Sequence, residues 1–343
     1  MITYRWDLTD LENIKTNGYK VFSCFGGGGG SSMGYKLAGF DVIGNLEIDA
    51  KINTIYKHNL NPKYNYNMDI RDFIKLEPLP NELYNLDILD GSPPCSSFSM
   101  SGNREKDWGK KKRFVEGGKL QTLDDLFFEF IRVAEKLSPK LIVAENVTGL
   151  VMGNAKSYVN KIIRKLKDAN YTTQIFLLNA ATMGVPQSRP RIFFIAYRND
   201  LELPKLELFF NEKPIFFNKV KEKDAIRYKK LTKSAQYIWN NKKYGDKNFS
   251  DVLVRIENRY SMFNLCFIYD DRVCNTLSTN RLSYILFSVP RYLTDSEIKL
   301  ISSFPMDYRC ICKRLSFVCG MSVPPIMMYK IAQQIYLQWL GGF

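Results

Sequence analysis

The first half of the chain alternates short apolar runs with amphipathic segments, and this alternation limits the fold more than any other feature. Strands are expected at 20–25, 41–46, 86–90, 140–144, 172–178 and 191–197, and helices at 32–38, 50–58, 123–136 and 158–169. Repeated strand–helix units place successive strands in parallel. The pattern therefore predicts an α/β fold, a mostly parallel sheet with helices on both faces.

Five consecutive glycines, Gly26 to Gly30, join the first predicted strand to the first predicted helix. Glycine lets the backbone approach a ligand closely, and the helix N-terminus that follows favours negative charge. Glu47 and Asp49 end the next strand about 20 residues on, where an acid suits the hydroxyls of a ribose. The pattern predicts nucleoside binding, equally compatible with a nicotinamide cofactor and S-adenosylmethionine. A flexible glycine turn is the alternative.

Cys95 follows Pro93-Pro94 directly after the apolar run 86–89. This places a thiol at the carboxyl end of a strand, where open α/β sheets carry their chemistry. The next segment, 101–120, is polar and basic, which suggests a lid that closes on a phosphate backbone. The alternatives are a buried cysteine that acts as a small hydrophobe, and a merely solvated loop.

Acidic and basic side chains follow at the ends of later strands. Glu145 comes directly after the run 141–144, which places its carboxyl group at the end of a strand, beside the strand that leads to the thiol. In that place a carboxyl group can protonate or hydrogen-bond a heterocycle. Arg189 and Arg191 stand two residues apart at a predicted strand start, which predicts that they point to the same side. One of them could then reach a ligand carbonyl and hold the glutamate.

The net charge of +14 and the pI of about 9.3 indicate a polyanionic partner, with nucleic acid the first candidate. From 205 to 260 the periodicity fades and basic residues predominate, which predicts a smaller binding domain. Seven scattered cysteines and a single histidine make a zinc site unexpected. No stretch is expected to cross a membrane and no signal peptide is evident, so we expect a cytoplasmic protein.

Taken in order, these residues resemble the motifs of the DNA (cytosine-5)-methyltransferases. The matching motifs are Phe25-x-Gly27-x-Gly29-Gly30, Pro94-Cys95 with Phe98-Ser99, Glu145-Asn146-Val147, Gln187-x-Arg189-x-Arg191, Thr276-Leu277-Ser278 with Arg291-x-Leu293-Thr294-x-x-Glu297, and Gly320-x-Ser322-Val323-Pro324-Pro325. Six motifs in family order are far more specific than any one of them.

The resemblance implies a Rossmann-like class I methyltransferase fold with a mixed, mostly parallel sheet, plus a smaller irregular target recognition domain. We expect a catalytic and cofactor-binding domain over 1–198, target recognition over 199–275, and a segment over 276–343 that returns to the catalytic domain.

The resemblance also implies roles for individual residues. The catalytic residues would be Cys95, Glu145, Arg189 and Arg191. The S-adenosylmethionine contacts would be Phe25, Gly27, Gly29, Gly30, Glu47, Ile48, Asp69, Ile70, Pro94, Leu126 and Ser322. The DNA contacts would be Ser99, Ser101, Arg104, Lys110, Lys111, Lys112 and Arg113. No metal site is implied.

The implied reaction is methyl transfer to carbon 5 of cytosine in a specific DNA sequence, after Cys95 adds to carbon 6 of a base flipped out of the duplex. The implied partner is double-stranded DNA. We expect a monomer in the cytoplasm of a bacterial or phage-infected cell, with any cognate restriction endonuclease acting separately.

Two other functions stay open at this point. The first is RNA modification by the branch of the family that shares the catalytic domain. The large basic segment 199–275 favours duplex DNA, because that branch has a different recognition segment. The second is a DNA-binding regulator with an inactive methyltransferase domain, which the presence of all four catalytic residues disfavours.

Overall fold

The computed structural model describes residues 2–94, 125–151, 156–226, 228–261, 265–311 and 315–341. The chain forms two compact units. The sheet unit consists of Leu11–Asn179, Pro190–Phe209 and Met328–Phe343. The second unit consists of Met1–Asp10, Ala180–Arg189 and Phe210–Met327.

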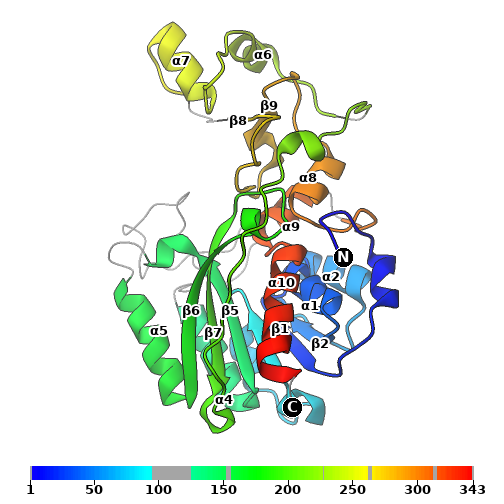
Figure 1. The fold of residues 1–343 in the computed structure, drawn as a ribbon, viewed down its shortest axis with the longest axis vertical. Helices are drawn as coiled ribbons and strands as arrows, with labels where there is room; N and C mark the ends of the chain where they lie inside the picture. The colour runs from blue at the N-terminus through cyan, green and yellow to red at the C-terminus, as the bar shows by residue number, and fades with distance from the viewer. Residues whose placement is uncertain are drawn as a thin grey trace. The chain divides into compact units, whose positions relative to one another are not determined.

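The sheet unit contains a seven-stranded sheet in the order β3-β2-β1-β4-β5-β7-β6 (Figure 1). Strands β1 to β5 are parallel, and β7 is antiparallel to both β5 and β6. The predicted mixed, mostly parallel sheet is therefore confirmed. The strands are β1 (Lys20–Cys24), β2 (Asp41–Leu46), β3 (Tyr64–Tyr66), β4 (Ile88–Gly91), β5 (Leu141–Val147), β6 (Tyr171–Asn179) and β7 (Pro190–Arg198).

Side chains alternate between the two faces of this sheet, as strand geometry requires. Phe22 and Leu89 belong to a hydrophobic core that also takes in residues of α3, α4 and α5. Ser23 and Asp90 come next along the same strands and so face the opposite side, where both are buried. The helices of the sheet unit are α1 (Gly30–Leu37), α2 (Ala50–Leu60), α3 (Ile70–Phe73), α4 (Leu126–Leu137) and α5 (Lys156–Asp168).

The second unit has its own small core. Helices α6 (Lys233–Asn240) and α7 (Phe249–Glu257) share a buried cluster with the parallel strands β8 (Cys266–Ile268) and β9 (Tyr284–Leu286). Both helices lie in the stretch that the sequence predicts to be irregular. Each buries only two or three side chains, so its apolar stripe is too short to show a clear period.

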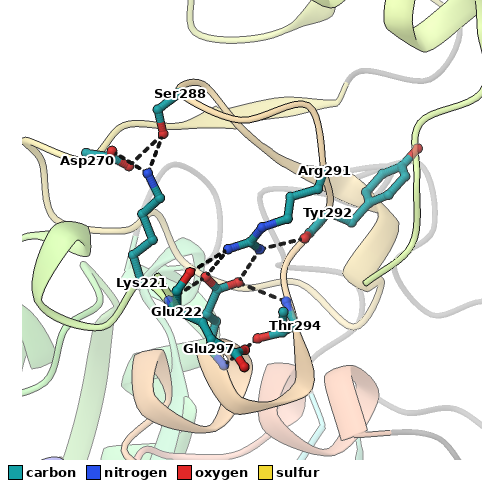
Figure 2. A network of polar contacts seen from close by, with 8 residues as sticks. All are labelled: Lys221, Glu222, Asp270, Ser288, Arg291, Tyr292, Thr294 and Glu297. Atoms are coloured by element: carbon teal, nitrogen blue, oxygen red, sulfur yellow. Dashed lines mark hydrogen bonds and ion pairs between the residues drawn. The ribbon is translucent and has the colours of Figure 1, made fainter. Parts of the chain in front are cut away.

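A buried network organises the C-terminal part of the second unit (Figure 2). Thr294 and Glu297 form a capping box at the start of α8 (Asp295–Ile301). The Glu297 carboxylate also accepts two 2.8 Å bonds from the Arg291 guanidinium, and it accepts a third bond from the backbone N–H of Glu222. The cap and the ion pair therefore share one carboxylate, which is fully buried.

The last helical stretch contains α9 (Leu315–Met321), α10 (Pro325–Ile335) and a π-helical turn, η10 (Tyr336–Leu340). By length and composition alone, Leu315–Leu340 is apolar enough to cross a membrane, contrary to the expectation that no stretch is. However, 67% of its most apolar window is buried inside the protein, as in the core helices of soluble proteins. The finding is therefore weak evidence for a membrane span.

Candidate functional site

The glycine loop after β1 is held in conformations that favour glycine. Gly27 and Gly29 have φ values of 53° and 85°, and Phe25 shares this left-handed region at 55°. A Cβ atom on Gly29 would lie 2.4 Å from the Leu60 side chain. The loop backbone can therefore lie close against α2, and it leads directly into the N-terminus of α1.

Glu47 lies just after β2 and fixes the loop from the other side. Its carboxylate accepts hydrogen bonds of 2.9 Å from the backbone N–H groups of Gly27 and Asp49. Burial raises the pKa of Glu47, and these two hydrogen bonds oppose the rise. The Asn67 side chain donates to the carbonyl groups of Glu47 and Ile48, a contact that the motifs did not reveal.

The other predicted cofactor residues of the sheet unit start local elements. Asp69 caps α3 through the Arg71 backbone N–H at 2.8 Å and pairs with the Arg71 guanidinium at 3.2 Å. Ile70 is buried, whereas Ile48 is exposed. Pro94 follows β4, and the buried Leu126 begins α4.

Ser322 belongs to the second unit. Its hydroxyl group donates to the Val318 carbonyl at 2.7 Å, and its side chain is buried. The contact closes the C-terminal end of α9 just before the Val323-Pro324-Pro325 run. This hydrogen bond is thus local to one helix end.

Glu145 and Arg191 meet on the neighbouring strands β5 and β7. The Arg191 Nε atom lies 2.8 Å from Glu145 Oε1, and the two side chains are only 12% and 9% exposed. Val147 lies opposite Arg191 in the register, so Arg191 reaches across to the residue two positions earlier on β5. A guanidinium in this place fixes the orientation of the carboxylate.

Asn146 links the same strand to the segment that leads into Cys95. Its amide nitrogen donates to the Pro93 carbonyl at 3.1 Å, and its amide oxygen accepts from the Val147 backbone N–H. The Glu-Asn-Val motif contains this residue, but the sequence alone assigned it no role. In the structure it holds β5 against the chain two residues before the predicted nucleophile.

Asp90 is a further buried acid at this end of the sheet. It accepts a 2.7 Å hydrogen bond from the Ser23 hydroxyl group on β1. Burial, with a smaller contribution from the charge of Glu145, raises the pKa of Asp90 to about 7. No motif marks Asp90 in the sequence, although an acid inside an apolar strand run is a visible signal.

Arg189 has different partners from Arg191. It is 1% exposed and donates to the backbone carbonyls of Leu277 and Gly320 at 3.3 and 2.8 Å. Strand β7 begins only at Pro190, so the alternation rule behind the same-side prediction does not apply to Arg189. These contacts hold together three segments of the second unit.

Several predicted site residues lie outside the described residues. These are Cys95 and the DNA-contact candidates Ser99, Ser101, Arg104, Lys110, Lys111, Lys112 and Arg113. Within the part of the chain that the structure describes, no group of three or more His, Cys, Asp or Glu side chains could hold a metal ion.

Comparison with known proteins identifies the family. The model of the C-5 cytosine-specific DNA methylases matches residues 19–337. The type II methyltransferase M.FnuDI of Fusobacterium nucleatum is 34% identical over 192 residues, which cover 55% of this chain and 49% of that protein. M.NgoPII of Neisseria gonorrhoeae is 26% identical over 353 residues, covering 93% of this chain and 96% of the relative.

Among solved structures, a DNMT2 variant of Spodoptera frugiperda aligns with a TM-score of 0.65. The alignment covers 93% of this chain and 100% of that one at 20% identity, so it supports the fold alone. The fold and the enzyme class that the sequence motifs implied are confirmed by these matches. Because the family model spans nearly the whole chain, the protein belongs to the C-5 cytosine-specific DNA methylases, enzymes that methylate carbon 5 of cytosine in DNA.

Proposed function

We propose that this chain methylates cytosine within a specific sequence of double-stranded DNA, with Cys95 as nucleophile and Glu145 and Arg191 as its partners on the base. The observation that carries the proposal is the Glu145–Arg191 pair at the end of the sheet, on a strand that Asn146 ties to Pro93. A carboxyl group, a guanidinium and the segment leading to a thiol thus belong to one end of one sheet.

The glycine loop fits the nucleoside part of S-adenosylmethionine. The backbone at Gly27 and Gly29 adopts left-handed conformations, and Glu47 presents a buried carboxylate that can accept further bonds from ribose hydroxyls. The Asp49 Oδ2 atom is buried and has no hydrogen-bond partner among the described residues. Bound S-adenosylmethionine supplies an electrophilic methyl group.

The remaining cofactor contacts that we propose are Phe25, Gly30, Ile48, Asp69, Ile70, Pro94, Leu126 and Ser322. Asp69 would accept a hydrogen bond from the adenine amine, and Ile70 would pack on the ring. The residue types suit these two contacts, and the resemblance to the family implies that both residues line the cofactor site.

The chain's own groups perform the chemistry on cytosine. The Cys95 thiolate adds to carbon 6, which makes carbon 5 nucleophilic. Glu145 holds ring nitrogen 3, and Arg191 keeps the glutamate in place while charge develops on the ring. After carbon 5 accepts the methyl group, it loses its proton, and the electron pair left behind expels the cysteine from carbon 6. Arg189 braces the second unit through the backbone carbonyls of Leu277 and Gly320.

The DNA partner is proposed to bind both the basic segment after Cys95 and a recognition domain within 199–275. The segment after Cys95 includes Ser99, Ser101, Arg104, Lys110, Lys111, Lys112 and Arg113. We further propose that the enzyme acts as a cytoplasmic monomer, separately from any cognate restriction endonuclease.

Covalent trapping tests the proposal. Purified protein is incubated with S-adenosylmethionine and duplex DNA that contains 5-fluorocytosine, since fluorine at carbon 5 prevents release of the cysteine. We expect an adduct that resists denaturation with the wild type and with Cys310→Ala, and none with Cys95→Ala. Absence of a wild-type adduct would refute the enzymatic proposal. Methylation of tRNA but not of DNA would favour the RNA-modifying branch.

A further inference from the structure

Aromatic rings and cations alternate in contact with one another in the second unit. None of these residues takes part in the proposed chemistry. Tyr269 and Phe287 stack with ring centroids 4.4 Å apart at an interplanar angle of 18°. Tyr244 meets both rings edge-on, at 5.4 and 6.1 Å. We call Lys242, Tyr244, Tyr269, Arg272 and Phe287 the cation–aromatic ladder.

Two cations, Arg272 and Lys242, lie over aromatic rings of this unit. The Arg272 guanidinium lies 4.2 Å from the centroid of Tyr269 and 5.3 Å from that of Tyr244. Lys242 Nζ lies over Trp239 at 3.1 Å and over Phe287 at 4.9 Å. A cation held on an aromatic face loses little further side-chain entropy when it binds a ligand. Arg272 is therefore pre-organised.

The base of the ladder is rigid and its outer end is open to solvent. Tyr269 is only 6% exposed, and its hydroxyl group donates to the Asp246 carbonyl at 2.7 Å. The Arg272 side chain is 47% exposed, and Tyr244 is 68% exposed. Asp271 accepts a 2.5 Å bond from the Tyr244 hydroxyl group and lies 4.0 Å from the Arg272 Nε atom. An exposed arginine thus stands on a buried aromatic support.

The charge of the stretch that carries Lys242 and Tyr244 favours a polyanionic ligand. Residues 205–260 carry 14 Lys or Arg against 7 Asp or Glu, and the exposed Lys247 lines the same hollow as Tyr269 and Arg272. A planar guanidinium matches the O6 and N7 acceptors of guanine, and this is the commonest specific contact between proteins and the major groove. Lysine lacks this fork geometry, and tyrosine and phenylalanine lack the charge.

We propose that Arg272 is a specificity-determining residue, which reads a guanine edge of the target DNA while Tyr244 and Tyr269 hold its plane. This assignment rests on the proposed methylation of duplex DNA. It goes further by naming one residue and one base type in sequence recognition. Lys242 acts as a brace at the other end of the ladder, because Trp239 and Phe287 hold it in place.

The test uses full-length protein, S-adenosylmethionine and a library of duplex DNA with random sequence, read by bisulfite sequencing. The wild type defines the methylated site. We expect Arg272→Gln to lower methylation of that site by about 10- to 100-fold and to relax the preference at one guanine position. Arg272→Lys should recover only part of the discrimination, because lysine keeps the charge without the fork.

Arg132→Gln is the matched control, because Arg132 is an exposed arginine on α4 of the sheet unit and pairs with Glu129 at 2.9 Å. It should leave both the rate and the site unchanged. Thermal unfolding and S-adenosylmethionine affinity of Arg272→Gln should equal those of the wild type, which separates recognition from a structural role.

Two results would overturn the assignment. One is an Arg272→Gln protein that methylates the wild-type site at the wild-type rate. The other is an even loss over all sequences with a weaker salt dependence, which marks a phosphate contact. In both cases a normal 5-fluorocytosine adduct would leave the proposed methyltransferase function standing, whereas failure of the wild type to form any adduct would refute that function itself.

Discussion

Replacing Asp90 by asparagine should stabilise the protein above neutral pH, although it changes a buried, hydrogen-bonded side chain on the central strand of the sheet. Asp90 is 2% exposed and accepts its hydrogen bond from the Ser23 hydroxyl group. An asparagine amide oxygen can accept the same bond. What the substitution removes is the charge, and in this buried place the charge is unfavourable.

The magnitude follows from the pKa of this carboxyl group, which burial raises from an ordinary value of 3.8 to about 7. Between these values the folded protein keeps a proton that the unfolded chain has lost, so stability falls as the pH rises through that window. About 1.4 kcal/mol per pH unit over about three units gives a penalty of about 4 kcal/mol, complete above pH 7. At pH 5 the penalty to the stability of the wild type is about 2 kcal/mol, and near pH 4 it almost vanishes.

Urea unfolding of wild type and Asp90→Asn, measured at several pH values from 5 to 8, provides the assay. The difference in free energy of unfolding between Asp90→Asn and the wild type should grow as the pH rises. Asp87→Asn is the matched control. Asp87 lies three residues earlier, just before β4, where it pairs with Lys140 at 2.8 Å and accepts a hydrogen bond from the Lys20 backbone N–H. It should gain no stability at pH 8. A difference that stays constant with pH, or a variant less stable than wild type at pH 8, would refute the reasoning.

Three further substitutions probe the other contacts. Arg191→Ala leaves the Glu145 carboxylate without its 2.8 Å partner, so methyl transfer should slow by about 100-fold or more while S-adenosylmethionine binding, measured by calorimetry, stays unchanged. Gly29→Ala places a Cβ atom 2.4 Å from a leucine of α2 at a φ of 85°, and thermal unfolding should show a loss of about 1–3 kcal/mol. Arg291→Met leaves Glu297 as a buried unpaired charge, which should cost about 3–5 kcal/mol in urea unfolding. Adding Glu297→Gln to that variant should restore part of the loss, and no recovery would argue against the charge as the cause.

The chemistry-bearing residues were predictable from sequence to different extents. Glu145 and Arg191 could be named from their motifs, but their contact depends on β7 lying antiparallel beside β5, which the order of elements along the chain does not reveal. Ser23 and Asp90 illustrate the same limit. Strand alternation places each of them on one face of its own strand, yet only the pairing of β1 with β4 makes them neighbours.

Arg189 shows a second limit, which concerns element boundaries. A shift of one or two residues in a predicted strand start changes which side chains share a face. Arg189 lies just before β7, so its guanidinium is directed by the loop and not by the strand. Its carbonyl partners come from residues about 90 and 130 positions further along, and no local pattern could have indicated them.

The same arginine has a consequence for the order in which the chain folds during synthesis. Gly320, which accepts one of its hydrogen bonds, is made 131 residues later. At bacterial or eukaryotic ribosome speeds this separates the two residues by roughly 7 to 26 s, far longer than the time in which hairpins such as β6–β7 form. Until then the Arg189 guanidinium lacks that backbone acceptor. The second unit can therefore reach its final packing only after Gly320 has been synthesised, whereas the β6–β7 hairpin can form before that.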